Sequence, residues 1–246
     1  MFIDTHAHFY DSNPDEVIAN AAAANVGIIV AASAHPDDLE KNTALCEKYE
    51  NIFCTIGIHP EYANQRSDFR FQISDKVIGI GEIGLDYHYE NNPPRDAQIE
   101  LFLRQLEIAQ NAGLPVAVHT RDAEQDTINI LGDHSGHGVL HCFTGTWNLA
   151  KTMLDRGWFV SASGIISFKN SDDLRDTFAR IPTDRIVIET DSPFCAPVPY
   201  RGKQCQPFMA AEVAKCMAQI KNIPLPEMEI ILEENTKRLY PKLCRN

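Results

Sequence analysis

The sequence predicts an α/β protein with the (β/α)8 fold of a TIM barrel, as one domain over residues 1–246. The chain has 246 residues, which is the usual size of such a barrel, about 250 residues. Eight short apolar runs recur along it with amphipathic helical patterns between them, and no Gly- or Ser-rich linker divides it. Regular alternation of strand and helix predicts a parallel sheet, and eight strands favour its closure into a barrel.

The eight apolar runs are interpreted as buried strands, because they are nearly continuous in Val and Ile instead of alternating with polar residues. Such runs are typical of strands covered on both faces. In chain order they are Phe2–Ile3, Gly27–Ala32, Ile52–Ile58, Val77–Ile83, Pro115–His119, Gly138–Cys142, Trp158–Ser161 and Ile186–Glu189.

The segments between the runs carry helical signals. Over Pro94–Ala112, apolar residues recur at intervals of three and four, which predicts an amphipathic helix. Asn13–Pro14 has the polar cap and first-turn proline of a helix start. Two more helices are expected near the C-terminus, at Pro207–Ile220 and Pro226–Glu234. The third connection, Glu61–Ser74, has little periodicity.

Composition limits the classes of partner. The formal charge is −12, from 34 acidic and 22 basic residues, which argues against broad electrostatic attachment to nucleic acid and leaves a local basic pocket or a bound metal. The seven cysteines are scattered without a C-x-x-C pair, and the start lacks the features of a signal peptide, so reduced thiols and a cytoplasmic location are expected. We expect no membrane span, and no obligate protein partner is inferred.

Histidines gather at the ends of the predicted strands. In an α/β barrel the carboxyl ends of the strands form the rim that holds the active site. Two of these histidines, His6 and His8, are two residues apart, so strand alternation turns them to the same side, where they can chelate one ion. The histidines at strand ends are His6, His8, His59, His119 and His141.

Two carboxylates join the same rim, Glu82 from the fourth strand and Asp191 after the eighth. Imidazoles and carboxylates that leave water positions open form a hydrolytic metal site, because the ion acidifies water and polarises the bond to be cleaved. Each residue alone would more simply be structural, but their convergence favours one or two divalent ions, with Glu82 shared between two. The predicted ligands are His6, His8, Glu82, His119, His141 and Asp191.

Four further residues of the rim stay outside this set. His59 is interpreted either as a substrate contact or as a turn residue. Arg121 and Arg201 either bind phosphate through their planar guanidinium groups or form surface salt bridges. Cys142 directly follows His141, so strand alternation predicts that its thiol is buried on the opposite face.

Gly79, Gly81 and Gly84 lie within and just after the fourth strand. A dinucleotide-binding loop needs its glycines between a strand and a helix. These three therefore predict close backbone packing of the strand that carries Glu82.

Seven motifs follow one another along the chain: Asp4–His8, Gly57–Pro60, Gly81–Tyr87, Leu114–Ala123, His141–Phe143, Glu189–Pro193 and Ala196–Lys203. Together they resemble the TatD family of deoxyribonucleases over essentially the whole chain. The resemblance implies a metal-dependent deoxyribonuclease that acts on DNA bound in a local pocket and trims single-stranded ends as an exonuclease. It places one ion among His6, His8, Glu82 and Asp191 and another among Glu82, His119 and His141. We further hypothesise that Asp191 acts as general base, because it is the one carboxylate of the eighth strand expected to face the site. The family is often assayed with magnesium, whereas an imidazole-rich site favours zinc, manganese or nickel.

The sequence departs from the family pattern at two places. Gln204–Pro207 stands where the family usually has Arg or Lys followed by Asn-Glu-Pro, and Ile99 stands where an arginine is usual. Neither departure touches the ligand set, so both bear on the choice of substrate. One alternative is hydrolysis of an ester or amide, as in a D-aminoacyl-tRNA deacylase, because the same chemistry attacks carbonyls. Another is a non-catalytic metal-binding protein.

Overall fold

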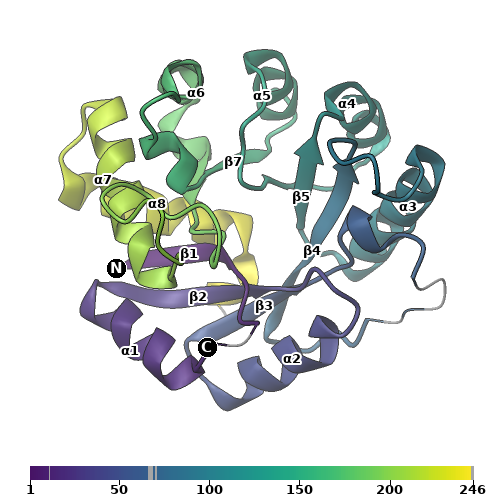
Figure 1. The fold of residues 1–246 in the computed structure, drawn as a ribbon, viewed down its shortest axis with the longest axis horizontal. Coiled ribbons are helices and arrows are strands. Elements are labelled where there is room, and N and C mark those ends of the chain that lie inside the picture. Colours follow the sequence, from purple (N-terminus) through teal and green to yellow (C-terminus); the bar gives the residue numbers. More distant parts are fainter. Residues whose placement is uncertain (11, 66–68, 70, 245–246) are drawn as a thin grey trace.

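The computed structural model describes residues 1–10, 12–65, 69 and 71–244. Eight parallel strands follow one another in chain order, β1 to β8, and Figure 1 shows helices around the outside of these strands. The last strand returns to the first, because the amide of Asp191 donates to the carbonyl of His6 at 2.9 Å and that of His8 donates to Ser192 at 2.8 Å. The predicted (β/α)8 TIM barrel is thereby confirmed.

All eight predicted strands are present, with changed ends. The greatest difference is at the first strand, which continues through Asp4, Thr5 and His6 although these residues are polar. The strands are β1 Phe2–Ala7, β2 Val26–Ala32, β3 Ile52–Ile56, β4 Val77–Asp86, β5 Val116–Arg121, β6 Gly138–Leu140, β7 Phe159–Ala162 and β8 Ile186–Ile188.

Helices follow most strands. The α-helices are α1 Pro14–Ala23, α2 Asp38–Lys48, α3 Arg95–Ala112, α4 Glu124–Asp133, α5 Trp147–Leu154, α6 Asp172–Arg180, α7 Ala210–Lys221 and α8 Leu225–Leu239. Short 3-10 helices are η1 Pro60–Tyr62, η2 Gly164–Ser167, η3 Thr183–Arg185, η4 Pro207–Met209 and η5 Pro241–Cys244. Between β3 and β4 the described residues hold only η1, and four residues of the predicted irregular connection lie outside them. Within the described chain, no helix has both the length and the apolar character needed to cross a membrane.

The apolar core has two main parts. The larger lies between the strands and the surrounding helices and includes Phe102 and Trp158. The smaller takes residues from seven strands and packs them against Leu239, Tyr240 and Leu243. Lys242 donates to the carbonyl of Val77, the first residue of β4, at 2.9 Å. The C-terminal segment therefore covers the amino ends of the strands, and the opposite end is free to form the site.

Glycines allow β4 to pack closely against its neighbours. Gly84 has φ 141°, and a Cβ there would lie 1.9 Å from the carbonyl oxygen of His119. A Cβ at Gly81 would lie 2.7 Å from that of Ala117, and one at Gly79 would lie 3.0 Å from the carbonyl oxygen of Pro115. The close packing predicted from these glycines is confirmed.

Gly84→Ala is expected to lower the free energy of unfolding by about 1–3 kcal/mol, the usual cost of overpacking a filled site. The matched control is Gly132→Ala in α4, where a Cβ would meet no atom within 4 Å. Because alanine is the better helix former, this control should be neutral or stabilise by up to about 1 kcal/mol. Urea denaturation measures both effects, and equal midpoints for the two variants would contradict this account of β4.

Candidate metal centre

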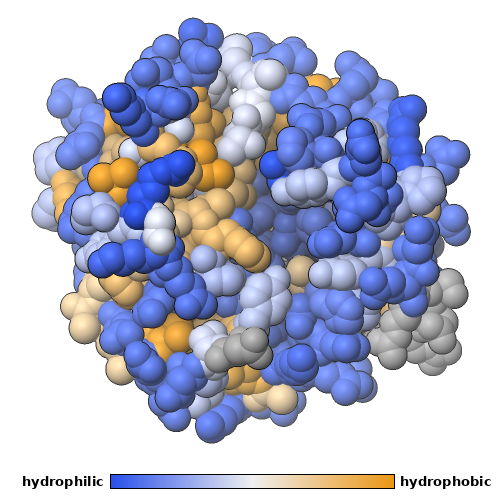
Figure 2. All heavy atoms as spheres, viewed as in Figure 1, coloured by the Kyte–Doolittle hydropathy of each residue, from blue (hydrophilic) through white to orange (hydrophobic). Residues whose placement is uncertain are grey.

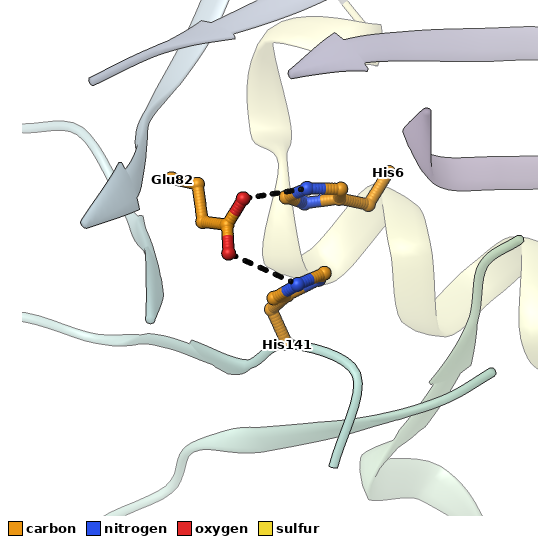
Figure 3. Close-up of side chains that lie close together, drawn as sticks. All are labelled: His6, Glu82 and His141. Carbon is orange, nitrogen blue, oxygen red and sulfur yellow. Dashed lines mark ion pairs between the residues drawn. The ribbon is translucent and has the colours of Figure 1, made fainter. Parts of the chain in front are cut away.

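The six predicted ligands meet at the carboxyl ends of the strands. His6, Glu82 and His119 lie on β1, β4 and β5, whereas the other three lie one to three residues beyond β1, β6 and β8. Figure 3 shows the side chains of His6, Glu82 and His141 pointing toward one another. On the face seen in Figure 2, the surface is mainly hydrophilic and is hollowed near its centre. The residues brought together are His6, His8, Glu82, His119, His141 and Asp191.

Glu82 lies at the middle of this cluster, with only 5% of its surface exposed. Its Oε2 is 3.4 Å from Nε2 of His6 and 3.7 Å from Nε2 of His8. Its Oε1 faces the other side, at 2.9 Å from Nδ1 of His119 and 3.3 Å from Nε2 of His141. The two oxygens of one carboxylate thus serve two sets of imidazoles, as the predicted sharing of Glu82 requires.

Asp191 completes the cluster from the loop after β8. Its Oδ1 lies 3.5 Å from Nε2 of His8 and 4.0 Å from Nε2 of both His6 and His141. Its backbone is left-handed, with φ 55°. Non-glycine residues in this conformation are uncommon and gather at functional sites. The turn directs the carboxylate toward the two histidines of β1.

The donor set fits a divalent cation. Nδ1 of His8 lies 3.0 Å from the carbonyl oxygen of Ala32, and because a carbonyl only accepts, this nitrogen carries the proton. In the neutral ring, Nε2 of His8 then presents a lone pair toward the carboxylates of Glu82 and Asp191. Nε2 of His6 is buried without a hydrogen-bond partner among the described residues. Facing lone pairs in a buried site require a cation between them.

Four groups of three residues place their ligand atoms within 4.8 Å of one another, so the cluster offers more than one set of donors for an ion. Glu82 and Asp191 belong to different groups that share His6. The groups are His6 with Glu82 and His141, His6 with His8 and Asp191, His59 with Asp86 and His119, and His141 with Cys142 and Asp191.

The pKa shifts differ among the histidines of the cluster. Burial lowers the pKa of His6, and the ring of His141, stacked on it with centroids 3.7 Å apart, lowers it further. Burial also lowers the pKa of His59 to about 3. Burial works against ionisation of Glu82, but His141 and His59 hold the pKa of that carboxyl well below its usual value. For His8, His119 and His141, burial opposes protonation, but the neighbouring carboxylates outweigh it and raise the pKa, that of His119 to about 8. Ligation needs neutral imidazoles beside an ionised carboxylate, so a cation that binds here displaces protons from these rings.

Two carboxylates that the sequence reading missed hold the histidines from behind. Oδ2 of Asp86 lies 3.0 Å from Nε2 of His119, and Oε1 of Glu189 lies 2.8 Å from Nδ1 of His141. Asp86 was open to detection, because it follows Glu82 by four residues on one strand and therefore shares its face. Carboxylates that bond the second nitrogen of a ligating histidine fix its orientation and raise its basicity.

Glu189→Gln is expected to weaken divalent-cation binding by about 10- to 100-fold, the usual effect of removing such a supporting carboxylate. The amide keeps the shape of the side chain but loses the negative charge beside His141. Titration of the metal-free protein against a competing chelator measures the affinity. Asp126→Asn is the control, because Asp126 pairs with Arg95 outside the cluster. Equal affinities of the two variants would contradict the role of Glu189.

Of the three residues predicted to contact substrate, His59 and Arg121 line the cavity and Arg201 does not. His59 lies at the cluster, with Nε2 3.6 Å from Oε1 of Glu82, and it also begins η1 by accepting from the amide of Glu61. Arg121 lines the cavity above the cluster. Arg201 does not reach this cavity, because its guanidinium stacks on Phe168 at 3.7 Å from the ring centroid.

The predicted orientation of Cys142 is wrong. Its side chain lines the cavity, and its thiol donates to the hydroxyl of Ser163 at 3.1 Å. Strand alternation fails here because β6 ends at Leu140 and Cys142 has a left-handed backbone with φ 40°.

The cavity has a volume of about 590 Å³, within the range of sites for small molecules. Its floor carries the buried histidines and carboxylates, and its lining includes Arg121, which comes from the end of β5. An α/β barrel with such a cluster at its strand ends defines a metal-dependent hydrolase.

Comparison with known proteins gives the family. The family model described as TatD related DNase matches residues 3–241, and the chain belongs to the TatD family of metal-dependent hydrolases. The chain is 35% identical to the uncharacterized metal-dependent hydrolase YabD of Bacillus subtilis, over 98% of this chain and 99% of that protein. It is 38% identical to the uncharacterized metal-dependent hydrolase YcfH of Escherichia coli, over 98% and 96% of the two chains. The crystal structure of YjjV, a TatD homologue from Escherichia coli, superposes with a TM-score of 0.89 at 28% identity and covers 98% of each chain.

Proposed function

We propose that the protein is a metal-dependent deoxyribonuclease that hydrolyses phosphodiester bonds at single-stranded ends of DNA. The observation that carries this proposal is the buried carboxylate of Glu82 between two sets of imidazoles, beneath a cavity lined by Arg121. The description of the matching family model, TatD related DNase, supports the same reaction. The size of the cavity favours a chain end over an intact duplex, and the charge of −12 favours local over extended contacts.

In this proposal His6, His8, Glu82 and Asp191 hold one divalent cation, and Glu82, His119 and His141 hold a second. A cation bound there would lower the pKa of water at the site and would neutralise the charge that develops on the phosphate. The imidazole-rich set favours zinc, manganese or nickel over magnesium at the occupied site.

The chain's own residues supply the remaining steps. Burial opposes ionisation of Asp191, but His8 and His141 hold the pKa of that carboxyl below its usual value, so it is ionised at neutral pH. A carboxylate that lines the cavity next to His8 can accept the proton of attacking water, and Asp191 is therefore the proposed general base. Arg121 pairs with a phosphate oxygen and orients the strand.

A second candidate is hydrolysis of an ester or amide, as in a D-aminoacyl-tRNA deacylase. The specific observation in its favour is that, among the described residues, Arg121 is the one Arg or Lys side chain that lines the cavity. With Arg201 placed on Phe168, recognition of phosphate depends on a single guanidinium.

A panel of substrates distinguishes the two candidates. Protein treated with a chelator and reloaded with zinc, manganese, nickel or magnesium is assayed on single-stranded DNA, duplex DNA, RNA and acyl esters that include D-aminoacyl-tRNA. We expect cation-dependent release of nucleotides from single-stranded DNA, and we expect Arg121→Glu to reduce it. Nuclease activity that survives chelation contradicts the proposal, and turnover of acyl substrates alone establishes the second candidate.

A further inference from the structure

Exposed aromatic side chains gather at the mouth of the cavity. Among the described residues, the exposed Phe, Tyr and Trp side chains are Tyr10, Tyr89 and Phe194, which are 50%, 51% and 52% exposed. All three line the cavity above the metal centre. Three solvent-exposed rings around one opening indicate a binding surface, because no other Phe, Tyr or Trp side chain in the described part of the chain is exposed.

Two of the rings lie next to His8, which directly follows β1. The ring of Tyr10 is parallel to that of His8, with an interplanar angle of 6° and centroids 5.2 Å apart. Phe194 stands at 68° to Tyr10, with centroids 6.4 Å apart. Tyr10 follows β1 and Phe194 follows β8, which neighbour each other in the barrel. These two rings form an apolar wall that adjoins a proposed ligand.

The third ring belongs to the other side of the barrel. Tyr89 follows β4 and Arg121 ends β5. The guanidinium of Arg121 donates to the hydroxyl of Tyr89 at 3.0 Å and lies 4.9 Å from the centroid of its ring. This pair presents a ring and a cation together, facing the same cavity as Tyr10 and Phe194.

We propose that Tyr10 and Phe194 on one side, and Tyr89 with Arg121 on the other, form a clamp that stacks on the unpaired bases next to the scissile phosphodiester. The inference rests on the proposed deoxyribonuclease function and names how its substrate is recognised. Every base has an aromatic face, so such a clamp is tolerant of sequence, and each stacked base contributes about 1–3 kcal/mol. A paired base keeps its faces inside the duplex, so the clamp selects single strands.

The charge of the protein makes stacking the main source of affinity. Proteins that hold DNA through its backbone use many basic side chains, whereas this chain has a charge of −12 and one arginine in the described lining of the cavity. Each neutralised phosphate of a single strand contributes about −0.7 to the slope of log affinity against log salt concentration. With one arginine at the cavity, the clamp therefore predicts a slope of log affinity against log salt concentration of about −0.7 or shallower.

The test compares a normal single-stranded oligodeoxynucleotide with one in which the terminal bases are replaced by abasic residues. With the metal-loaded enzyme we expect kcat/KM to favour the normal strand by about 5- to 150-fold, which is about 1–3 kcal/mol of stacking, mainly through KM. In Tyr10→Leu and Phe194→Leu this preference should fall toward one. Tyr10→Phe, which keeps the ring, should retain the preference.

Leu103→Ala is the control, because Leu103 is an exposed apolar residue of α3 outside the cavity. It should keep the preference for the normal strand. Equal kcat/KM for the normal and abasic strands, or a salt slope as steep as that of many phosphate contacts, overturns the clamp and leaves the nuclease proposal standing. Cleavage of neither strand by the metal-loaded wild type overturns both.

Discussion

Glu82→Gln should weaken divalent-cation binding by more than about 100-fold, because it removes a direct ligand, whereas loss of a supporting carboxylate alone costs about 10- to 100-fold. The five imidazoles of His6, His8, His59, His119 and His141 all lie within 3.7 Å of this carboxylate. The amide of glutamine cannot balance cations held among them. Hydrolysis should therefore fall by at least about 10³-fold, since loss of a single electrostatic contact to developing charge already costs about 10²–10³.

Glu61→Gln is the matched control for this variant. Glu61 lines the same cavity but its carboxylate is 56% exposed and lies 4.0 Å from Nδ1 of His59, so the same substitution should leave cation binding intact. Elemental analysis of dialysed protein and steady-state kinetics compare the two variants. If Glu82→Gln retained both the cation and the activity, Glu82 would not be a metal ligand.

Asp191→Asn is expected to lower kcat by about 10²–10⁴-fold, the usual contribution of a positioned general base. The fold should be kept, because asparagine has the same shape and tolerates the left-handed backbone at this position, φ 55°. Circular dichroism checks the fold, and single-turnover rates at saturating cation separate the loss of a base from the loss of a ligand.

Asp122→Asn supplies the control for Asp191. Asp122 has nearly the same backbone, with φ 54°, but its carboxylate pairs with His88, and neither of these two residues lines the cavity. This substitution should leave kcat unchanged. Full hydrolysis by Asp191→Asn would show that proton transfer does not involve Asp191.

The fold could be predicted because buried parallel strands leave a strong pattern in the sequence. The prediction was weakest where polar residues are buried. The first strand was expected to end at Ile3, yet it continues to Ala7, because the carboxylate of Asp4 accepts from the hydroxyl of Thr190 at 2.6 Å. Such a partner lies 186 residues away, and hydropathy along the chain carries no sign of it.

The site could be predicted for residues whose side-chain direction is determined by strand alternation or by the end of a strand. His6, His8 and Glu82 lie where this rule places them. Where a strand gives way to a loop the rule no longer applies, and Cys142 and Arg201 are placed by local backbone and by stacking instead. Rings at the rim, such as Tyr89, show no periodicity in sequence, because loops hold them.

The central claim is that the buried histidines and carboxylates hold a divalent cation that supports hydrolysis. Calorimetric titration of the chelator-treated wild type with zinc or manganese tests it most directly, with hydrolysis followed in the same samples. We expect saturable binding of at least one cation per chain, and hydrolysis that returns in proportion to occupancy. Absence of stoichiometric binding, together with hydrolysis that proceeds at the same rate without added cation, would contradict the claim.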